Sequence, residues 1–302
     1  VETDESDGSF LKCSPDINVV TNIDNDHLDF WGSFDSLKQA FYSYLSNTKL
    51  ASPRIVCVDN EYLFDWAKAN PENTVSYAIS HEADWQVVDI TDKGWGISCR
   101  VLHGGEPVAE MRLNVPGYYN IQNALAAVAS SFYAGISPQE SCAHLSEFPG
   151  VERRLQRIGE YGGVLVLDDF AHHPREITAV LGAIRRSMPN ARIIALFQPH
   201  RYSRTRLLFN EFGAAFGEAD TVIVTGIYTG PGEKKDSYIG SGSISNSIQE
   251  SGHRSVFKID DMDEASSFAA RLCHRGDVVV TLGAGDIWKS HKALSQLLAA
   301  VQ

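Results

Sequence analysis

Three polar clusters in the chain contain the side-chain types that metal, acid–base and phosphate chemistry require. The first lies in the segment TNIDNDHLD and contains Asp24, Asp26, His27 and Asp29. Carboxylate oxygens and an imidazole at this spacing could surround a divalent cation, and the acidic segment VETDESD could add ligands. The alternative is a solvated loop that caps the next helix, and the residues alone leave both interpretations open.

The second cluster ends an apolar run and has the sequence DDFAHHP, which contains Asp168, Asp169, His172 and His173. Two carboxylates and two imidazoles offer a base and hydrogen-bond partners for an amine or a phosphate. A surface pair of histidines is the alternative interpretation. The order of these residues after an apolar run favours a site at the end of a strand.

The third cluster is rich in arginine and lies in QPHRYSRTR. The members that gather positive charge and hydrogen-bonding groups at the expected strand end are Gln198, His200, Arg201, Arg204 and Arg206. Arginine forks bind carboxylates or phosphates bidentately, so this cluster predicts a local anion site in a chain of formal net charge −12. The alternative is the basic start of a solvated helix.

Two shorter motifs complete the set of candidate residues. Arg153 and Arg154 lie near the middle of the chain, where an arginine at a hinge could reach a nucleotide, although a solvated pair is the alternative. The segment GAGD, residues 283–286, is too short for a dinucleotide fingerprint and predicts a tight turn. The pattern GxxxxGK[ST] of a phosphate-binding loop is absent from these 302 residues.

The elements that must position these clusters alternate between strands and helices. In the first half, apolar periodicity predicts a strand at 16–22, a helix at 33–45, a strand at 54–58, a helix at 62–69, antiparallel strands within 76–115 and a helix at 120–133. Together they predict an α/β domain over residues 1–150.

The second half predicts another α/β domain, with a Rossmann-like order of elements, over residues 151–302. Strands are expected in GGVLVLDDF, in ARIIALFQPH and at 221–225 and 278–282, and a helix at 174–187. The clusters DDFAHHP, QPHRYSRTR, TGIYTGPGE and GAGD all follow strands, so we expect one active-site rim at the carboxyl ends. The Ser/Gly-rich stretch 237–247 is expected to be a surface loop.

Composition excludes several classes of protein. With 43% hydrophobic and 21% charged residues the chain is an ordinary globular protein, and the net charge of −12 argues against a nucleic-acid partner. The five cysteines are widely spaced without a CxxC pair, which favours a reducing cytoplasm over a disulfide framework or a zinc site. No apolar run reaches the length of a membrane span.

Taken together and in order, the motifs resemble the Mur ligase family. The resemblance extends along nearly the whole chain, through ETDESDGSFL, VVTNIDNDHLDFWGSFDSLKQAF, NIQNALAA, GVERRLQ, LDDFAHHPREI, FQPHRYSRTR and GAGDIW. It implies a central ATPase domain and a C-terminal Rossmann-like domain. It also implies that the chain begins inside the ATPase domain, without the first domain and the phosphate-binding loop of the family.

The resemblance also implies roles for particular residues. Glu2 and His27 resemble the residues that hold magnesium, with Glu5 as the alternative acid. Asn120 and Asn123 match nucleotide-contacting asparagines, while Tyr119 stands where the family usually has histidine. The remaining matches lie in the second domain: Arg154 and Asp169 resemble residues that meet the nucleotide when the domains close, and His172, His173, Arg201 and Arg204 resemble the substrate-facing groups.

The activity implied by the resemblance is the ATP-dependent joining of L-alanine to UDP-N-acetylmuramate in the cytoplasm, with Mg²⁺ and through an acyl phosphate. Because the phosphate-binding loop is absent, the chain by itself is expected to be inactive. Two alternatives stay open: a peptide-recycling ligase that acts on the same UDP-sugar, and a non-catalytic fragment that binds nucleotide or amino acid.

Overall fold

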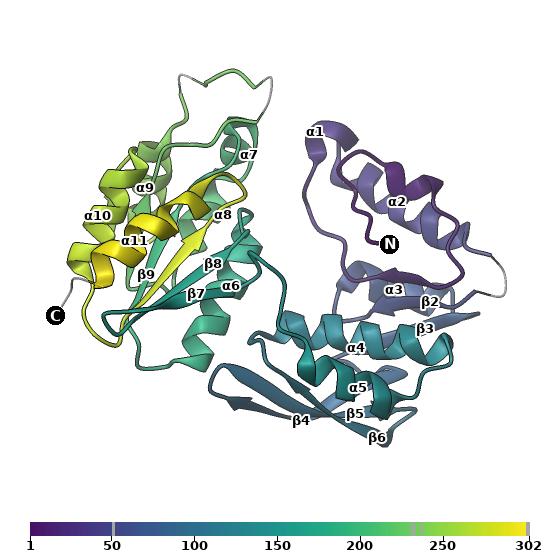
Figure 1. The fold of residues 1–302 in the computed structure, drawn as a ribbon. Coiled ribbons are helices and arrows are strands. Elements are labelled where there is room, and N and C mark those ends of the chain that lie inside the picture. The colour runs from purple at the N-terminus through teal and green to yellow at the C-terminus, as the bar shows by residue number, and fades with distance from the viewer. Residues whose placement is uncertain (50–51, 231–232, 237, 300–302) are drawn as a thin grey trace. The chain divides into compact units, whose positions relative to one another are not determined.

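The computed structural model describes residues 1–49, 52–230, 233–236 and 238–299 (Figure 1). The chain divides into two compact units, one formed by Val1–Asn114 and Tyr118–Phe148 and the other by Val115–Gly117 and Pro149–Gln302. Each unit contains a six-stranded sheet and helices that pack against it. The predicted α/β class is therefore confirmed.

The first unit has a mixed sheet with the strand order β1-β2-β3-β4-β5-β6. Its strands are β1 (Asn18–Val20), β2 (Arg54–Cys57), β3 (Thr74–Ala78), β4 (Trp85–Lys93), β5 (Gly96–His103) and β6 (Glu106–Leu113). The pairings from β1 to β4 are parallel, and β4, β5 and β6 pair antiparallel. The antiparallel strands predicted from alternating residues are thus confirmed.

Helices of the first unit bury apolar faces against this sheet. They are the 3-10 turn η1 (Ser9–Lys12), α1 (Leu28–Trp31), α2 (Phe34–Ser46), α3 (Glu61–Ala69), α4 (Tyr118–Tyr133) and α5 (Pro138–Glu147). Ser33 caps α2 by accepting a hydrogen bond from the Ser36 N–H over 3.1 Å, as its position predicts. Helix α4 is apolar on one side, and its alanines allow it to lie close to β2 and β3.

The second unit has a mostly parallel sheet with the order β11-β10-β9-β12-β8-β7, in which only the pairing of β7 with β8 is antiparallel among those described. The strands are β7 (Gln156–Tyr161), β8 (Val164–Asp169), β9 (Ile193–Phe197), β10 (Thr221–Val224), β11 (Val256–Lys258) and β12 (Val278–Leu282). Four central strands, β8, β9, β10 and β12, are almost entirely buried. Their unbroken runs of Val, Ile and Leu are typical of strands covered on both faces.

The helices of the second unit connect these strands. They are α6 (Pro174–Ser187), α7 (Tyr202–Leu207), α8 (Phe209–Ala214), α9 (Ser241–Glu250), α10 (Met262–Leu272), the 3-10 turn η2 (Ile287–Lys289) and α11 (Ser290–Ala299). Helix α6 begins with Pro174 at its first position and with the Glu176 carboxylate accepting the His173 N–H over 3.1 Å.

The prediction of a surface loop at 237–247 was wrong from Ser241 onwards, where α9 begins, while residue 237 lies outside the described part of the chain. Small residues explain the difference. A Cβ on Gly213 of α8 would lie 2.6 Å from the Ser247 hydroxyl, so α8 and α9 pack closely because both are small at this contact. Ile244 and Ile248 are fully buried, so tertiary packing overrides the low helix propensity of Ser and Gly.

Candidate functional site

The polar clusters of the second unit meet at the carboxyl ends of β8, β9 and β12. Leu282 of β12 pairs with Asp169 of β8 on one side and with Phe197 of β9 on the other. The chain leaves β9 towards β10 but leaves β12 towards α11, which packs against β7 and β8. Adjacent strands with diverging connections form the crevice where open α/β sheets bind ligands. The motifs expected to form the rim therefore lie together at this edge of the sheet.

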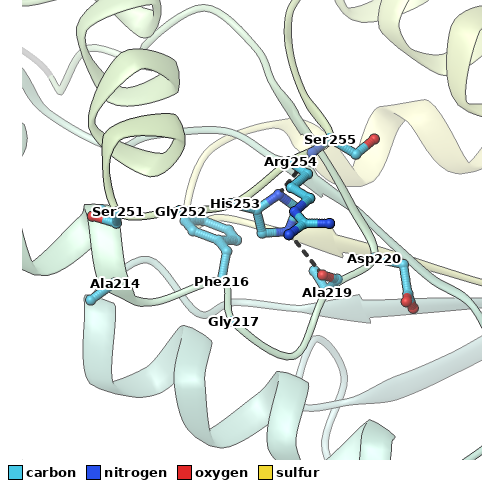
Figure 2. A pocket seen from close by; sticks show the side chains of 11 residues that line it. Ala214, Phe216, Gly217, Ala219, Asp220, Ser251, Gly252, His253, Arg254 and Ser255 are labelled. Carbon is cyan, nitrogen blue, oxygen red and sulfur yellow. Dashed lines mark hydrogen bonds between the residues drawn. The ribbon is translucent and has the colours of Figure 1, made fainter.

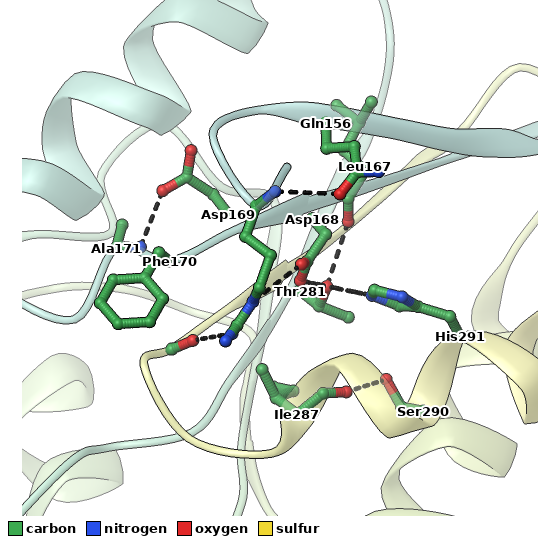
Figure 3. A network of polar contacts seen from close by, with 12 residues as sticks. Gln156, Leu167, Asp168, Asp169, Phe170, Ala171, Thr281, Ile287, Ser290 and His291 are labelled. Atoms are coloured by element: carbon green, nitrogen blue, oxygen red, sulfur yellow. Dashed lines mark hydrogen bonds and ion pairs between the residues drawn. The ribbon is translucent and has the colours of Figure 1, made fainter. Parts of the chain in front are cut away.

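A buried polar network surrounds Asp168 at the end of β8 (Figure 3). The Thr281 hydroxyl donates to Asp168 Oδ1 over 2.6 Å, and Arg153 Nε donates to Oδ2 over 3.2 Å. His291 Nε2 lies 3.3 Å from Asp168 Oδ1. Burial raises the pKa of this carboxyl, but hydrogen bonds from His291 and Thr281 and the charge of Arg153 outweigh it and leave the pKa lowered. Asp168 is thus held as a carboxylate.

The side chain of Asp169 is hydrogen-bonded to two loops. Its oxygens accept the N–H groups of Ala171 over 2.7 Å and of Leu155 over 2.6 Å. Burial raises the pKa of Asp169 to about 7, against the lowering effects of these N–H groups and of Arg154. Arg153 and Leu155 have left-handed backbone φ values of 59° and 48°, which is uncommon outside glycine and occurs preferentially at functional sites. Asp169 as a whole is only 2% exposed.

The arginine pair lies beside Phe170. The guanidinium carbons of Arg153 and Arg154 lie 4.9 Å and 5.5 Å from the centre of the Phe170 ring. Arg153 also donates to the carbonyl of Gly283, so it is bound within the second unit. Arg154 lies beside the same ring, and its charge lowers the pKa of Asp169.

The hydrogen bonds of His172 and His173 determine which ring nitrogen of each histidine carries the proton. His172 Nδ1 lies 2.9 Å from the carbonyl oxygen of Phe170, which can only accept, so Nδ1 carries the proton. In the neutral ring, Nε2 is then an acceptor. His173 caps α6 by accepting the Arg175 N–H at Nδ1 over 3.3 Å, so its Nε2 carries the proton. That Nε2 is buried without a hydrogen-bond partner among the described residues.

The arginine cluster lies beside these histidines. The rings of His172 and His200 are 5.7 Å apart and nearly perpendicular. Burial lowers the pKa of His200 to about 4, with further lowering by His172, Arg204 and Arg201. Arg204 Nη1 lies 3.2 Å from His200 Nδ1, and Arg201 has a left-handed φ of 66°. We call His172, His173, Arg201 and Arg204 the rim.

The segment after β10 belongs to the TGIYTGPGE cluster that was expected at the rim, and it is hydrogen-bonded to the rim, although none of its residues was assigned a role from the sequence. Tyr228 N–H donates to the Pro199 carbonyl over 2.8 Å, and Arg201 N–H donates to the Tyr228 carbonyl over 2.9 Å. The Glu233 carboxylate accepts the Ser203 N–H and hydroxyl over 3.0 Å each. The sequence gives only a weak indication of these contacts, because the segment offers only one acid and one tyrosine among several glycines.

The GAGD segment lies directly against Gln198. Gln198 Nε2 donates to Asp286 Oδ1 over 3.0 Å, and its Oε1 accepts the Ile287 N–H over 3.1 Å. A Cβ on Gly285 would lie 2.3 Å from Gln198 Oε1 and 2.6 Å from Tyr228 Cγ. The glycine therefore allows three segments to approach one another, which goes beyond the tight turn predicted from the sequence.

We expect Gly285→Ala to lower the free energy of unfolding by about 1–3 kcal/mol, because the added methyl must push Gln198 and Tyr228 apart. Thermal unfolding measures this. Gly217→Ala is the matched control, since a Cβ there would meet no atom within 4 Å. Equal melting temperatures for the two variants would show that the GAGD segment moves freely.

In the first unit, Asp59 organises the carboxyl end of β2. Its carboxylate accepts the N–H groups of Ile79 over 2.7 Å and Ser80 over 2.9 Å, and the Gln122 amide over 2.8 Å. Gln122 lies in the first turns of α4, between the predicted nucleotide contacts Asn120 and Asn123. Asn123 is exposed and Asn120 is half-buried. Asp59 thus fixes the helix that presents both asparagines.

The proposed metal residues lie on one loop and at the start of the chain. His27 precedes α1 with a left-handed φ of 54°, and its Nε2 lies 3.7 Å from Asp26 Oδ2. Glu5 is half-buried, and burial raises the pKa of its carboxyl while nearby His27 opposes this. Glu2 is exposed. Both acids therefore remain candidates for the metal pair with His27.

The described residues contain no group of three or more His, Cys, Asp or Glu side chains that could hold a metal ion. The side chain of Asp29 lies outside those residues. Among the described side chains, Asp24, Asp26 and His27 therefore form no such group, and the part of the predicted cluster that depends on Asp29 lies outside the described residues. An open pair of ligands still fits Mg²⁺, which usually keeps several waters and binds substrate phosphates.

A pocket of about 380 Å³ opens at the opposite edge of the second unit's sheet, before β10 and β11 (Figure 2). His253 uses both ring nitrogens within the protein, on the Ala219 carbonyl at 2.8 Å and the Ser255 N–H at 3.3 Å. Asp220 accepts from Arg185 over 2.7 Å. None of the candidate site residues lines this pocket, so the crevice at the carboxyl ends remains the candidate site.

Comparison with known proteins identifies the family. Residues 2–131 match the Mur ligase middle domain, and residues 153–285 match the Mur ligase glutamate ligase domain. The chain therefore belongs to the Mur ligase family. Among the described helices, none combines the length and apolar character that crossing a membrane requires.

Relatives named UDP-N-acetylmuramate–L-alanine ligase are similar to the whole chain. That of Desulfosudis oleivorans is 39% identical over 288 residues, which are 95% of this chain and 63% of the relative. That of a Geobacter species is 37% identical over 301 residues, 100% of this chain and 65% of the relative. The chain thus spans about two thirds of the length of these relatives.

Solved structures have the same fold. The UDP-N-acetylmuramate-alanine ligase MurC of Thermotoga maritima has a TM-score of 0.76 and 25% identity, covering 96% of this chain and 61% of that one. The MurF ligase of Thermotoga maritima, solved in complex with ADP, has a TM-score of 0.75 and 17% identity, and the match covers 96% of this chain and 64% of MurF. At this identity the similarity shows only that the two chains share a fold.

Proposed function

We propose that this chain carries the ATP-dependent ligation of L-alanine to UDP-N-acetylmuramate, a step in the synthesis of peptidoglycan precursors. The observation that carries the proposal is the similarity, at 36–39% identity, to relatives that are named for this activity and matched over 95–100% of the chain. The cationic rim supports it, because the reacting carboxyl group of the sugar and the carboxylate of the amino acid both carry negative charge.

The proposed first step joins the sugar carboxylate to the γ-phosphorus of ATP, with release of ADP and formation of an acyl phosphate. Asn120 and Asn123 would contact the nucleotide from α4, and Arg154 and Asp169 are the proposed nucleotide residues of the second unit. Glu5 or Glu2 with His27 would hold Mg²⁺, which neutralises phosphate charge when bound.

In the proposed second step the amine of L-alanine attacks the acyl carbonyl, an amide bond forms and phosphate leaves. Arg201 and Arg204 would bind the alanine carboxylate, since guanidinium groups match its geometry. His173 has a buried Nε2–H that would serve as a donor, and His172 would take the proton of the attacking amine. The crevice would hold these groups in the orientation that the reaction requires.

The test uses the protein encoded by the complete reading frame that contains these residues. It is incubated with ATP, Mg²⁺, UDP-N-acetylmuramate and one amino-acid donor, and the products are identified by mass spectrometry. We expect ADP and the L-alanyl product in equal amounts. Preference for a peptide donor over L-alanine would favour the peptide-recycling ligase, and no product with any donor would favour a binding role.

We also propose that the 302-residue chain alone does not ligate alanine, because its sequence contains no GxxxxGK[ST] segment to position the phosphates of ATP. ADP formation by the purified chain that requires both UDP-N-acetylmuramate and L-alanine would contradict this proposal.

We expect Arg204→Lys to lower kcat/KM for L-alanine by about tenfold or more and to leave the KM for ATP nearly constant. Lysine keeps the charge but loses the planar fork, and hydrogen bonds to charged groups contribute roughly 1.5–3 kcal/mol. Steady-state kinetics in the complete protein measures both parameters. Arg254→Lys, at an exposed arginine of the pocket in Figure 2, is the control. Unchanged alanine kinetics in a folded Arg204→Lys protein would remove this arginine from the amino-acid site.

A further inference from the structure

His291 lies on α11, outside every motif that points to the proposed function, yet it contacts the buried network behind the rim. Its Nε2 lies 2.9 Å from the Thr281 hydroxyl and 3.3 Å from Asp168 Oδ1 (Figure 3). Its side chain is only 16% exposed. We infer that His291 is a positioning residue for the rim, an inference that rests on the proposed function.

The hydrogen bonds determine which atom of His291 carries the proton. The Thr281 hydroxyl has a single hydrogen, and its shortest contact, 2.6 Å, is with the carboxylate of Asp168. Its remaining capacity is as an acceptor, so His291 Nε2 must carry a hydrogen, which it shares between the Thr281 hydroxyl oxygen and Asp168 Oδ1. Asp168 then receives Thr281 and His291 at one oxygen and Arg153 at the other. A carboxylate held at both oxygens has one orientation.

That orientation determines where Arg153 lies. Arg153 Nε donates to Asp168 Oδ2 over 3.2 Å, and another nitrogen of the same guanidinium donates to the Gly283 carbonyl. One side chain thus connects the end of β8 to the GAGD segment after β12. If Asp168 rotates, Arg153 loses its fixed acceptor and the connection loosens.

The contacts continue from Arg153 to the rim through Phe170. The Phe170 N–H donates to the Arg153 carbonyl over 2.7 Å, and the Arg153 guanidinium carbon lies 4.9 Å from the Phe170 ring centre. The Phe170 carbonyl accepts His172 Nδ1–H over 2.9 Å, and the two rings are 5.3 Å apart. Each contact fixes the next, so His291 determines the orientation of His172 without touching a substrate.

The first experiment needs no catalysis and uses the 302-residue chain. Nitrogen-15 NMR is expected to show His291 protonated at Nε2 and His172 at Nδ1. In His291→Ala, the Arg153 Nε–H should exchange with solvent roughly tenfold faster, because its acceptor is no longer fixed. His291→Gln, whose amide can donate to Asp168 and Thr281, should restore slow exchange. The exposed His274→Ala is the control, with a side chain 78% exposed.

The second experiment measures kinetics in the complete protein. We expect His291→Ala to lower kcat by about tenfold with the KM for alanine and ATP within about twofold, because misplaced groups weaken the transition state. His291→Gln should recover most of kcat. A role in stability alone would lower the melting temperature of both variants and leave kcat unchanged at temperatures where they are folded, which would overturn the inference.

The two experiments separate the inference from the proposed function. If the complete protein does not ligate alanine, the proposed function fails, and the NMR results still decide whether His291 holds Asp168 and Arg153. Unchanged Arg153 exchange in His291→Ala would overturn the inference whatever the enzyme does. Should His291→Ala not fold, Thr281→Val tests the same network from the other donor, and we expect the same faster exchange.

Discussion

Replacing Asp168 by alanine is expected to lower the free energy of unfolding by about 3–5 kcal/mol, the range for breaking a buried ion pair by removing one partner. Asp168 is fully buried and receives Arg153, Thr281 and His291. Once the Asp168 carboxylate is removed, the largely buried guanidinium of Arg153 keeps the Gly283 carbonyl as an acceptor but loses its carboxylate partner. Denaturant unfolding with urea measures the change.

The control for this variant is Glu110→Ala, which removes an exposed ion pair of similar length. Arg100 Nε lies 3.1 Å from Glu110 Oε1, but the Glu110 side chain is 69% exposed, and we expect a change of at most about 1 kcal/mol. An equal fall in the free energy of unfolding for the two variants would show that the buried Asp168 network contributes no more to stability than an exposed ion pair.

The Asp168 network also predicts how the free energy of unfolding changes with pH. Because the folded-state pKa of Asp168 is lowered from its ordinary 3.8, the unfolded chain binds a proton more readily. The stability that Asp168 contributes is then fully present above pH 3.8 and is lost as the pH falls through the lower folded-state value. The difference between wild type and Asp168→Ala should therefore shrink in strong acid.

In the complete protein, His27→Ala is expected to lower magnesium-dependent turnover by roughly a hundredfold, the upper end of the effect of losing an outer-shell partner, while the melting temperature barely changes. The His27 side chain is 28% exposed and lies on a loop, so its removal leaves little cavity. Turnover across a magnesium titration and thermal unfolding measure the two effects separately.

Two further variants separate the loss of the imidazole from other effects of the substitution. His27→Asn removes the imidazole but keeps a residue that tolerates the left-handed φ of 54°, so backbone strain is not the variable. The exposed His144→Ala in the same unit is the control. A large fall in melting temperature with unchanged magnesium dependence would show that His27 is structural.

The order of elements and the location of the crevice were predictable from local sequence. Apolar runs without alternation indicated buried parallel strands such as β8 and β12, and alternating segments indicated β4, β5 and β6. Because parallel strands present their carboxyl ends at one edge, motifs far apart in the chain could be placed together before their contacts were known. The family also followed from the order of these motifs.

Tertiary structure decided which polar side chains contact one another. Nothing local distinguishes His291 from other helix histidines, or Thr281 from other strand residues, since their roles depend on β12 lying beside β8. The same reason explains the wrong prediction for α9, where close packing on Gly213 outweighs local propensity.

The two adjacent aspartates show most plainly what sequence determines and what it leaves to the fold. Sequence placed Asp168 and Asp169 together at the end of one strand. Because successive strand residues point to opposite faces of a sheet, they meet different partners: Asp168 receives Thr281, His291 and Arg153, whereas Asp169 receives the N–H groups of two loops. Sequence thus determined the strand and its chemistry, and only the packed sheet determined the opposite pKa shifts of these two carboxyls.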